Sequence, residues 1–404
     1  MTTRKGQSTL LLLIGCLDEM MKEIKKCLLL LAIIFLSCDR QLSVKNTPPD
    51  NSAEAQQEPE WLIIGGQRVR NFERHRVHDY YLNSEIDNIE GIGLFINPKD
   101  ETRATNLEGI EQVKNLRSLT IWGWNLDILD YSPINLLQNL NDITFESRGE
   151  DKLTRVPVLR DTVARESMIK IVFTNCALTN MDNIEYLSNL RYVEVAKNYG
   201  DIINIEALNN LKYLETLKIF STDESVYKIE EITSLARLSH LYLDGKLINI
   251  KGIENLSSLE HIDFSECNVI NTRYLSMLKN VKYLYIMIRE SVPDIGFLEG
   301  MESLERLTIY ADDGTWGRQT VERYQILDLG PIGNLSQLTN LSLCGFILKN
   351  VAALDKLDNL EQTYFMHSVL KDSLETSNKK LIFHPDAPGF IPVWGINEWP
   401  RGSE

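Results

Sequence analysis

The sequence predicts an α/β repeat solenoid: an arc with a parallel β-sheet on its concave face and 3₁₀, short helical or irregular returns on its convex face. Three observations support this fold class. A pattern of spaced apolar residues recurs from about residue 92 to residue 366. Each copy opens with a period-two alternation, which is typical of a short strand. Each copy then changes to a three-residue apolar period, which favours a 3₁₀ or irregular return.

The clearest copy begins at Met168. It reads Met168-x-x-Ile171-x-Phe173-x-x-Cys176-x-Leu178-x-x-Met181-x-x-Ile184-x-x-Leu187, and Leu190 opens the next copy. Ile171 and Phe173 lie two positions apart, so both point to one side of a strand while the residue between them points to the other. The pattern therefore predicts one buried and one open face for every strand.

This pattern resembles the bacterial leucine-rich repeat of the internalin type, LxxLxLxxNxIxxIxxLxxL. We call the second leucine position of each LxxLxL the anchor. The anchors are Leu94, Leu119, Ile143, Ile171, Val193, Leu217, Leu241, Ile262, Leu284, Leu307, Leu341 and Thr363. The resemblance implies about eleven or twelve units over residues 92–366. No single unit buries its own apolar side, so stacked units must share one core.

The turn after each strand is expected to leave backbone amides facing the interior. A buried polar side chain there can satisfy them. Asn198 fills this position in one unit, and Cys176 and Cys267 fill it in two others. We therefore expect both cysteines to be buried parts of the repeat rather than reactive thiols.

Both ends of a stacked core need a cover. Residues 61–91 are expected to form the amino-terminal cap. Thr363 breaks the leucine pattern, and residues 367–404, rich in proline and aromatic residues, are expected to cover the last unit. A ligand-binding tail is the alternative interpretation of this last segment.

The amino-terminal segment, residues 1–37, indicates a signal peptide. Residues 20–26 are mostly basic, and residues 27–36 form an apolar run too short to span a bilayer as a mature helix. The following Phe35-Leu36-Ser37-Cys38 resembles a relaxed, spirochaete-like lipobox, which implies that Cys38 is lipidated. A better translation start follows at Met20 or Met21, so a mis-called start codon is one explanation of residues 1–19. An uncleaved anchor, or cleavage by signal peptidase I, are the alternatives.

Residues 38–60 contain few large apolar side chains and predict a disordered tether after the lipidated cysteine. A flexible coil of this length spans about 25 Å. Together with the resemblance to lipoproteins, this predicts a lipid-anchored protein of the bacterial cell envelope, at the outer membrane or cell surface. A periplasmic orientation is the alternative.

Composition excludes some function classes. The net charge of −15 argues against a nucleic-acid partner, because phosphates require a basic surface. The six cysteines form no CxxC pair and no zinc-type spacing. We find no nucleophile motif, phosphate loop or metal motif, and we expect no metal, no cofactor and no enzymatic activity.

His240 and His261 fall in one column of adjacent repeats and could approach each other, but no further catalytic group accompanies them.

The open face of the predicted sheet carries many aromatic residues. We predict that they form a ligand-binding surface, because tyrosine and tryptophan dominate binding hot spots. High strand propensity and stacking between neighbouring strands are the structural alternative. The candidates are Trp122, Tyr192, Phe220, Tyr242, Tyr283, Tyr285, Tyr310 and Tyr364.

One repeat is longer than the others, since Leu307 and Leu341 lie 34 residues apart. The extra residues at 311–325 carry Trp316, Arg318 and Arg323, and form a candidate binding loop because repeat insertions map to loops on one face. A neutral excursion is the alternative. Cys344 falls in an outward column and is expected to be an exposed free thiol.

The combined prediction is a lipid-anchored leucine-rich-repeat protein, expected to be monomeric, whose concave face binds a protein ligand of unknown identity. The resemblance to internalins implies adhesion or interaction with a host protein. A periplasmic scaffold that binds another envelope protein is the second hypothesis, and an enzyme with an unrecognised site is the third.

Overall fold

The computed structural model describes residues 60–70, 80–97, 104–159, 167–200, 202, 204–221, 226–264, 267–288, 294–311, 325–366, 368–370 and 381–384. The chain divides into two compact units, Met1–Glu58 and Pro59–Glu404, and all described residues belong to the second. Cys38, the expected signal peptide and nearly all of the expected tether lie outside the described residues. The same is true of Trp316, Arg318 and Arg323.

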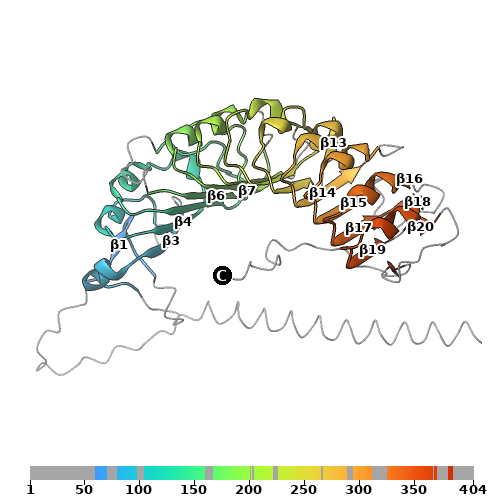
Figure 1. Ribbon diagram of the computed structural model, residues 1–404. Helices are drawn as coiled ribbons and strands as arrows, with labels where there is room; N and C mark the ends of the chain where they lie inside the picture. The colour runs from blue at the N-terminus through green and yellow to red at the C-terminus, as the bar shows by residue number, and fades with distance from the viewer. Residues whose placement is uncertain are drawn as a thin grey trace, which may run out of the picture. The chain divides into compact units, whose positions relative to one another are not determined.

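A thirteen-stranded parallel sheet forms the inner side of the second unit (Figure 1). Its strands follow one another in chain order, so each repeat adds one strand beside the last. They are β3 (Gly91–Ile96), β4 (Ser118–Gly123), β5 (Asp142–Ser147), β6 (Lys170–Thr174), β7 (Tyr192–Asn198), β8 (Thr216–Ser221), β10 (His240–Asp244), β12 (His261–Phe264), β14 (Tyr283–Ile288), β15 (Arg306–Ala311), β17 (Asn340–Cys344), β19 (Gln362–Met366) and β21 (Leu381–His384).

The strand register confirms the expected anchors, with one correction. From Leu119 to Thr363 each anchor pairs with the next across the sheet. In β3, however, Ile92 pairs with Leu119, whereas Leu94 pairs with Ile121. Choosing Leu94 as an anchor was therefore wrong by two residues. Both side chains point inward, so the alternation alone could not separate them.

Short 3₁₀ helices form the outer side of the unit (Figure 1). No α-helix occurs among the described residues. Several of these helices start from a left-handed Asn or Gly, such as Asn183 and Gly252, which tolerate a positive φ better than other residues. They are η2 (Asn83–Asn88), η3 (Ile110–Gln112), η4 (Leu126–Ile128), η5 (Ser132–Leu136), η7 (Ile184–Tyr186), η8 (Glu206–Asn210), η9 (Ile229–Glu231), η10 (Ile253–Asn255), η11 (Thr272–Met277), η12 (Gly296–Gly300), η14 (Gly330–Asn334) and η15 (Val351–Lys356).

Two small parallel sheets are formed by short strands, each of which follows a strand of the large sheet along the chain. One contains β9 (Val226–Lys228), β11 (Leu247–Asn249) and β13 (Asn268–Ile270), and the other contains β16 (Gln325–Asp328), β18 (Phe346–Lys349) and β20 (Val369–Leu370). The large sheet also continues past residue 366, because β21 pairs in parallel with β19. The parallel strand pairing thus extends into residues 367–404, the segment that was expected to cover the last unit.

One continuous core runs through all the repeats. Its side chains are the inward residues of the strands and the three-residue series of the returns, and most are fully buried. Phe145 and Phe173 of adjacent repeats stack with ring centroids 5.5 Å apart. Cys176 and Cys267 are buried free thiols, as expected from the sequence. Since equivalent residues meet across each repeat boundary, every unit is stabilised by its neighbours.

Asn198 satisfies buried backbone groups of the preceding repeat. A bulge in β7 places Lys197 at a positive φ and turns Asn198 inward, where its side chain is fully buried. Its Oδ1 accepts a hydrogen bond from the Leu178 amide at 2.7 Å, and its Nδ2 donates to the Leu178 carbonyl at 3.0 Å. Cys267 has a similar role, because its Sγ donates to the Leu243 carbonyl at 2.9 Å.

A second series of asparagines links repeats just before the strands, at positions that the sequence analysis did not single out. Each Nδ2 donates to a backbone carbonyl one repeat earlier. The pairs are Asn115 to Asp87, Asn139 to Lys114, Asn280 to Ser257 and Asn359 to Ser336, at 2.8 to 3.0 Å. These residues are exposed, so they are expected to contribute less than Asn198.

Replacing Asn198 by alanine is expected to lower the free energy of unfolding by about 2–6 kcal/mol, because two buried backbone groups of Leu178 lose their partner at about 1–3 kcal/mol each. Asn359→Ala, which removes one exposed hydrogen bond, is the matched control and should cost less than about 1 kcal/mol. Guanidinium unfolding followed by circular dichroism measures both. Equal losses in the two variants would contradict the role given to Asn198.

Candidate ligand-binding face

A row of stacked aromatic and cationic side chains crosses the open face of the large sheet. We call this row the concave ladder. It comes from seven strands, β6, β7, β8, β10, β12, β14 and β15. Its members are Lys170, Tyr192, Lys218, Tyr242, His261, Tyr283 and Arg306.

The first half of the ladder alternates cations with tyrosine rings. The Nζ of Lys170 lies 5.1 Å from the ring centroid of Tyr192. The Nζ of Lys218 lies between two rings, 5.6 Å from that of Tyr192 and 4.7 Å from that of Tyr242. Each contact is within the range of a cation–π attraction, which contributes about 0.5–1 kcal/mol at exposed sites.

The second half is a ring stack centred on His261. Its ring centroid lies 5.0 Å from that of Tyr242 and 5.1 Å from that of Tyr283, with which it is nearly parallel at 19°. His240 stacks on His261 at 5.5 Å, which confirms that the two histidines approach each other. The guanidinium carbon of Arg306 lies 5.3 Å from the Tyr283 ring and closes the row.

The sheet register brings four of the six neighbouring pairs of the row side by side, and the pairs Tyr192–Lys218 and Tyr242–His261 are diagonal neighbours. Parallel strands lie about 4.8 Å apart, and the register brings the same position of each repeat side by side. Rings in neighbouring strands therefore stack, and each such pair contributes about 0.5–1.5 kcal/mol beyond its buried area. The stack occupies the ring faces. The ring edges, which carry positive partial charge, are left to meet a ligand.

Burial and neighbouring cations keep the two histidines neutral. Burial, then the charges of His240, Lys218 and Arg306, lowers the pKa of His261 to about 4. The pKa of His240 is also lowered, chiefly by burial. At neutral pH both rings are therefore uncharged and can stack without repulsion.

Tyr192 and Tyr242 of the ladder stay protonated at physiological pH. Burial, followed by the Asp263 carboxylate, raises the pKa of Tyr242 to about 12. The pKa of Tyr192 is raised by burial and by the hydrogen bond that its hydroxyl donates to Glu194. Both hydroxyls therefore act as hydrogen-bond donors rather than as bases.

The structure separates the eight aromatic candidates into several groups. Tyr192, Tyr242 and Tyr283 belong to the concave ladder. Tyr285 pairs with Tyr310 at 5.2 Å between ring centroids. Tyr310, however, is only 4% exposed, so the expectation that it lies open on the face is wrong; burial raises its pKa.

The remaining three candidates lie apart from the ladder. Trp122 is on β4 beside Phe95, with ring centroids 6.0 Å apart. Phe220 is half-buried on β8, and Tyr364 is exposed on β19. The lysines and the arginine of the ladder were not predicted as binding residues, although they occupy the same outward columns as the tyrosines. The column register is the signal that could have found them.

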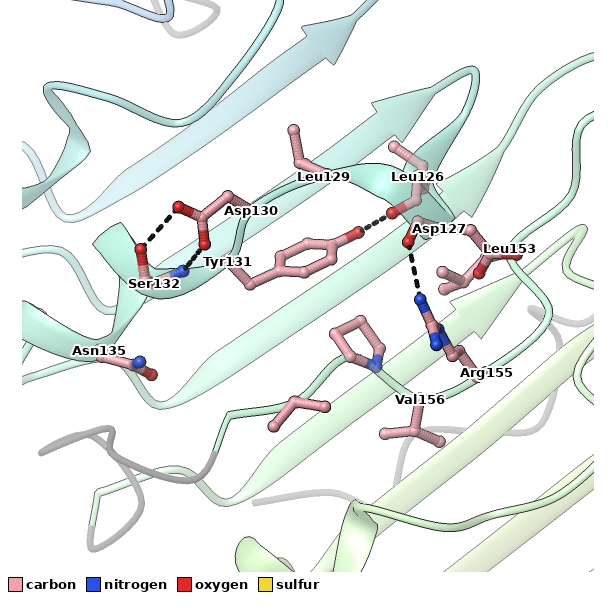
Figure 2. A pocket seen from close by; sticks show the side chains of 12 residues that line it. Leu126, Asp127, Leu129, Asp130, Tyr131, Ser132, Asn135, Leu153, Arg155 and Val156 are labelled. Atoms are coloured by element: carbon pink, nitrogen blue, oxygen red, sulfur yellow. Dashed lines mark hydrogen bonds between the residues drawn. The ribbon is translucent and has the colours of Figure 1, made fainter.

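A hollow of about 280 Å³ lies among the returns that follow β4 and β5, on residues 126–135 and 153–158 (Figure 2). Its polar groups are largely engaged with one another. The Tyr131 hydroxyl donates to the Leu126 carbonyl at 2.8 Å, and Asp130 accepts from the amide and the hydroxyl of Ser132. Arg155 donates to the Asp127 carbonyl at 3.3 Å. These bonds brace two repeats and present no reactive group.

The described residues offer no metal centre, since no group of three or more His, Cys, Asp or Glu side chains in those ranges could hold an ion. Cys344 lies in the outward column at intermediate exposure, and burial raises the pKa of its thiol to about 11. It is therefore not an activated nucleophile. Within the described ranges, no helix is long and apolar enough to cross a membrane.

Burial of the His261 ring predicts that the free energy of unfolding depends on pH. Its pKa of about 4 lies below the ordinary 6.5, so the unfolded chain takes up a proton at higher pH than the folded chain. The stabilisation by the neutral ring is complete above about pH 6.5 and is lost as the pH falls toward 4. We expect this ring to account for a loss of about 2 kcal/mol in unfolding free energy between pH 7.5 and 4.5.

His261→Phe keeps a ring in the stack but cannot titrate, so its stability should fall less over the same interval. Guanidinium unfolding of both proteins at the two pH values measures the difference, with the pH 7.5 values as the internal control. An identical acid-induced loss in the two proteins would show that His261 stays accessible to protons.

Comparisons with known proteins place these features in context. No protein-family model and no curated protein matches the chain. Among solved structures, an internalin from Listeria monocytogenes has 15% identity over 72% of this chain and 91% of its own, with a TM-score of 0.46. A leucine-rich-repeat protein of Leptospira interrogans has 16% identity over 74% and 76%, with a TM-score of 0.49.

A third structure is the leucine-rich-repeat ectodomain of a plant membrane receptor kinase from Arabidopsis thaliana, in complex with Casparian strip integrity factor 2. It has 18% identity over 69% of this chain and 35% of its own, with a TM-score of 0.46. The fold of this chain is established by its own strand order and register: it is a leucine-rich-repeat solenoid.

Proposed function

We propose that this chain binds a protein ligand through the concave ladder. The observation that carries the proposal is the unbroken run of tyrosine, histidine, lysine and arginine side chains over seven adjacent strands. Such a run spans roughly 29 Å, six intervals of about 4.8 Å. An extended segment or a protein surface can contact several of these residues at once, as binding interfaces require.

The composition of the ladder suits binding. Tyrosine and arginine are enriched in hot spots because they remove much area from water at small cost in side-chain entropy. Here the neighbouring rings and cations already order each side chain, so little further entropy is lost on binding. Glu194 lies beside Lys218 and Asp263 beside Tyr242 in the sheet, so the face carries both signs of charge and a ligand with polar and mixed charges would match it.

The proposal also includes a lipid anchor at Cys38. Acylation of Cys38 would attach the chain to a membrane of the bacterial cell envelope, and residues 39–60 would hold the repeats away from it. Two or three acyl chains anchor a protein stably where one does not. With the repeats outside the cell, the function would be adhesion or interaction with a host protein. With the repeats in the periplasm, it would be a scaffold for another envelope protein.

Site-specific photocrosslinking in producing cells tests the binding face. We expect a benzoylphenylalanine residue in place of Tyr242 to give a discrete covalent adduct, because this side chain lies at the centre of the ladder. The same residue in place of Met277, which is exposed on η11 of the outer side, is the matched control and should give none. Adducts from Met277 and none from Tyr242 would move the ligand to the convex face.

Once the crosslinked protein is identified, Tyr242→Ala and Tyr283→Ala should each weaken its binding about tenfold, the effect of a moderate hot spot. Met277→Ala should leave the dissociation constant unchanged. Calorimetric titration measures the constants, and circular dichroism verifies the fold. Unchanged binding in both tyrosine variants, with the fold intact, would remove the ladder from the interface.

The anchor is tested by Cys38→Ser. Metabolic labelling with an alkyne fatty acid should label the wild-type protein and leave the variant unlabelled, because serine lacks the thiol that is acylated. Cys344→Ser is the control and should be labelled like the wild-type protein. Labelling that persists in Cys38→Ser would exclude the lipoprotein interpretation.

Protease shaving of intact cells distinguishes the two locations. Loss of the repeats from intact cells would favour the adhesion function. Their survival in intact cells, followed by digestion after lysis, would favour the periplasmic scaffold.

A further inference from the structure

A second candidate site lies at the amino-terminal end of the repeats, away from the concave ladder. The strands β1 (Ile63–Ile64) and β2 (Gln67–Arg68) form an antiparallel hairpin, and residues of this hairpin line a hollow together with residues of β3 and β4. The hollow has a volume of about 550 Å³, and we call it the hairpin groove. Its lining includes Ile63, Arg68, Arg70, Tyr80, Phe95 and Trp122.

The groove has a fixed frame. Gly65 and Gly66, both at positive φ, make the tight hairpin turn. The Gly65 amide donates to the Glu108 carbonyl at 2.8 Å, and a Cβ on Gly65 would lie 2.2 Å from the Asn106 carbonyl oxygen. The hairpin is therefore clamped against the first repeat. A preformed frame of this volume is typical of small-ligand sites.

One wall of the groove is aromatic and partly open to solvent. Phe95 contacts Trp122 at 6.0 Å and Trp124 at 5.1 Å between ring centroids, which holds the Trp122 indole at the groove. Ile63 lines the opposite side and is 51% exposed, a large exposed fraction for an isoleucine. These side chains offer an apolar surface that a ligand would remove from water.

The described side chains that line the groove carry charge of one sign. They include the guanidinium groups of Arg68 and Arg70, and none of these described residues is a carboxylate. Among the described residues, neither arginine has an ion-pair partner. The Arg68 guanidinium lies over the Trp61 ring at 5.3 Å, so its face is stacked while its in-plane N–H donors remain available. In a chain with a net charge of −15, this is a local positive site.

We propose that the hairpin groove binds a carboxylate carried on an apolar or aromatic body. A guanidinium edge matches the two oxygens of a carboxylate, and Arg68 and Arg70, two positions apart on an extended segment, point to the same side. The apolar body would lie against Trp122 and Ile63. The carboxyl terminus of an apolar peptide and a free apolar acid share this chemistry.

The test uses residues 59–404, the compact unit that contains every described strand and core residue. The fluorescence of anilinonaphthalene sulfonate, an anion on an aromatic body, reports occupancy. N-acetyl-Leu-Phe with a free carboxylate and its carboxamide form are compared as competitors, together with decanoate and decanol. We expect each carboxylate to displace the dye at a concentration at least tenfold lower than its neutral counterpart.

Arg68→Gln with Arg70→Gln should weaken dye binding about tenfold and remove the preference for carboxylates. Arg237→Gln is the matched control, because Arg237 also lies over an aromatic ring, that of Tyr213 at 4.9 Å, but outside the groove. Tyr242→Ala should have no effect, which separates this site from the proposed function. Both arginines are exposed, and circular dichroism verifies the fold of each variant.

Displacement by the peptide acid would support a peptide terminus as the ligand, and displacement by decanoate alone would support a free apolar acid. Equal displacement by the acids and their neutral counterparts would overturn the proposal. Dye binding that is unchanged in the double arginine variant would also overturn it.

Discussion

The structure depends on the backbone hydrogen bonds that fix each strand to the one before it. At the start of each strand of the large sheet from β4 to β19, two successive amides donate to one carbonyl of the previous repeat. The series begins with the amides of Arg117 and Ser118, which donate to Glu90, and ends with those of Glu361 and Gln362, which donate to Thr339. This repeated bond sets the register, and the register sets the columns. A slip of one residue would exchange the buried and open faces, so both the core and the concave ladder follow from it.

The same register explains which parts of the molecule the sequence could predict. Inward leucines repeat at nearly constant intervals, so the strands, their order and their columns follow from the pattern. Leu94 shows where this fails, because β3 has no preceding repeat and two inward residues fit equally well. The αL residues that start the returns and the Asn115 series would have required attention to polar residues, which occupy these positions in only some of the repeats.

The candidate site was only partly predictable for a different reason. The columns identified Tyr192, Tyr242 and Tyr283, whereas the cations between them occupy positions where a solvated charge is the ordinary expectation. Lys218 becomes part of the ladder only because tyrosines flank it on both neighbouring strands, a property of three repeats together. The burial of Tyr310 likewise depends on side chains around it, which a column cannot predict.

Stacking has a consequence for what the concave face can recognise. An isolated tyrosine offers its ring face to a ligand, but here the faces of Tyr242, His261 and Tyr283 already contact one another. The groups that remain are ring edges and the cations at the ends of the row, which favour acceptor atoms over apolar contact. Trp122 differs, since it lines a separate groove with two arginines nearby. One sheet thus presents two chemically distinct surfaces, because its aromatic residues are stacked in the middle and only partly covered at the amino-terminal end.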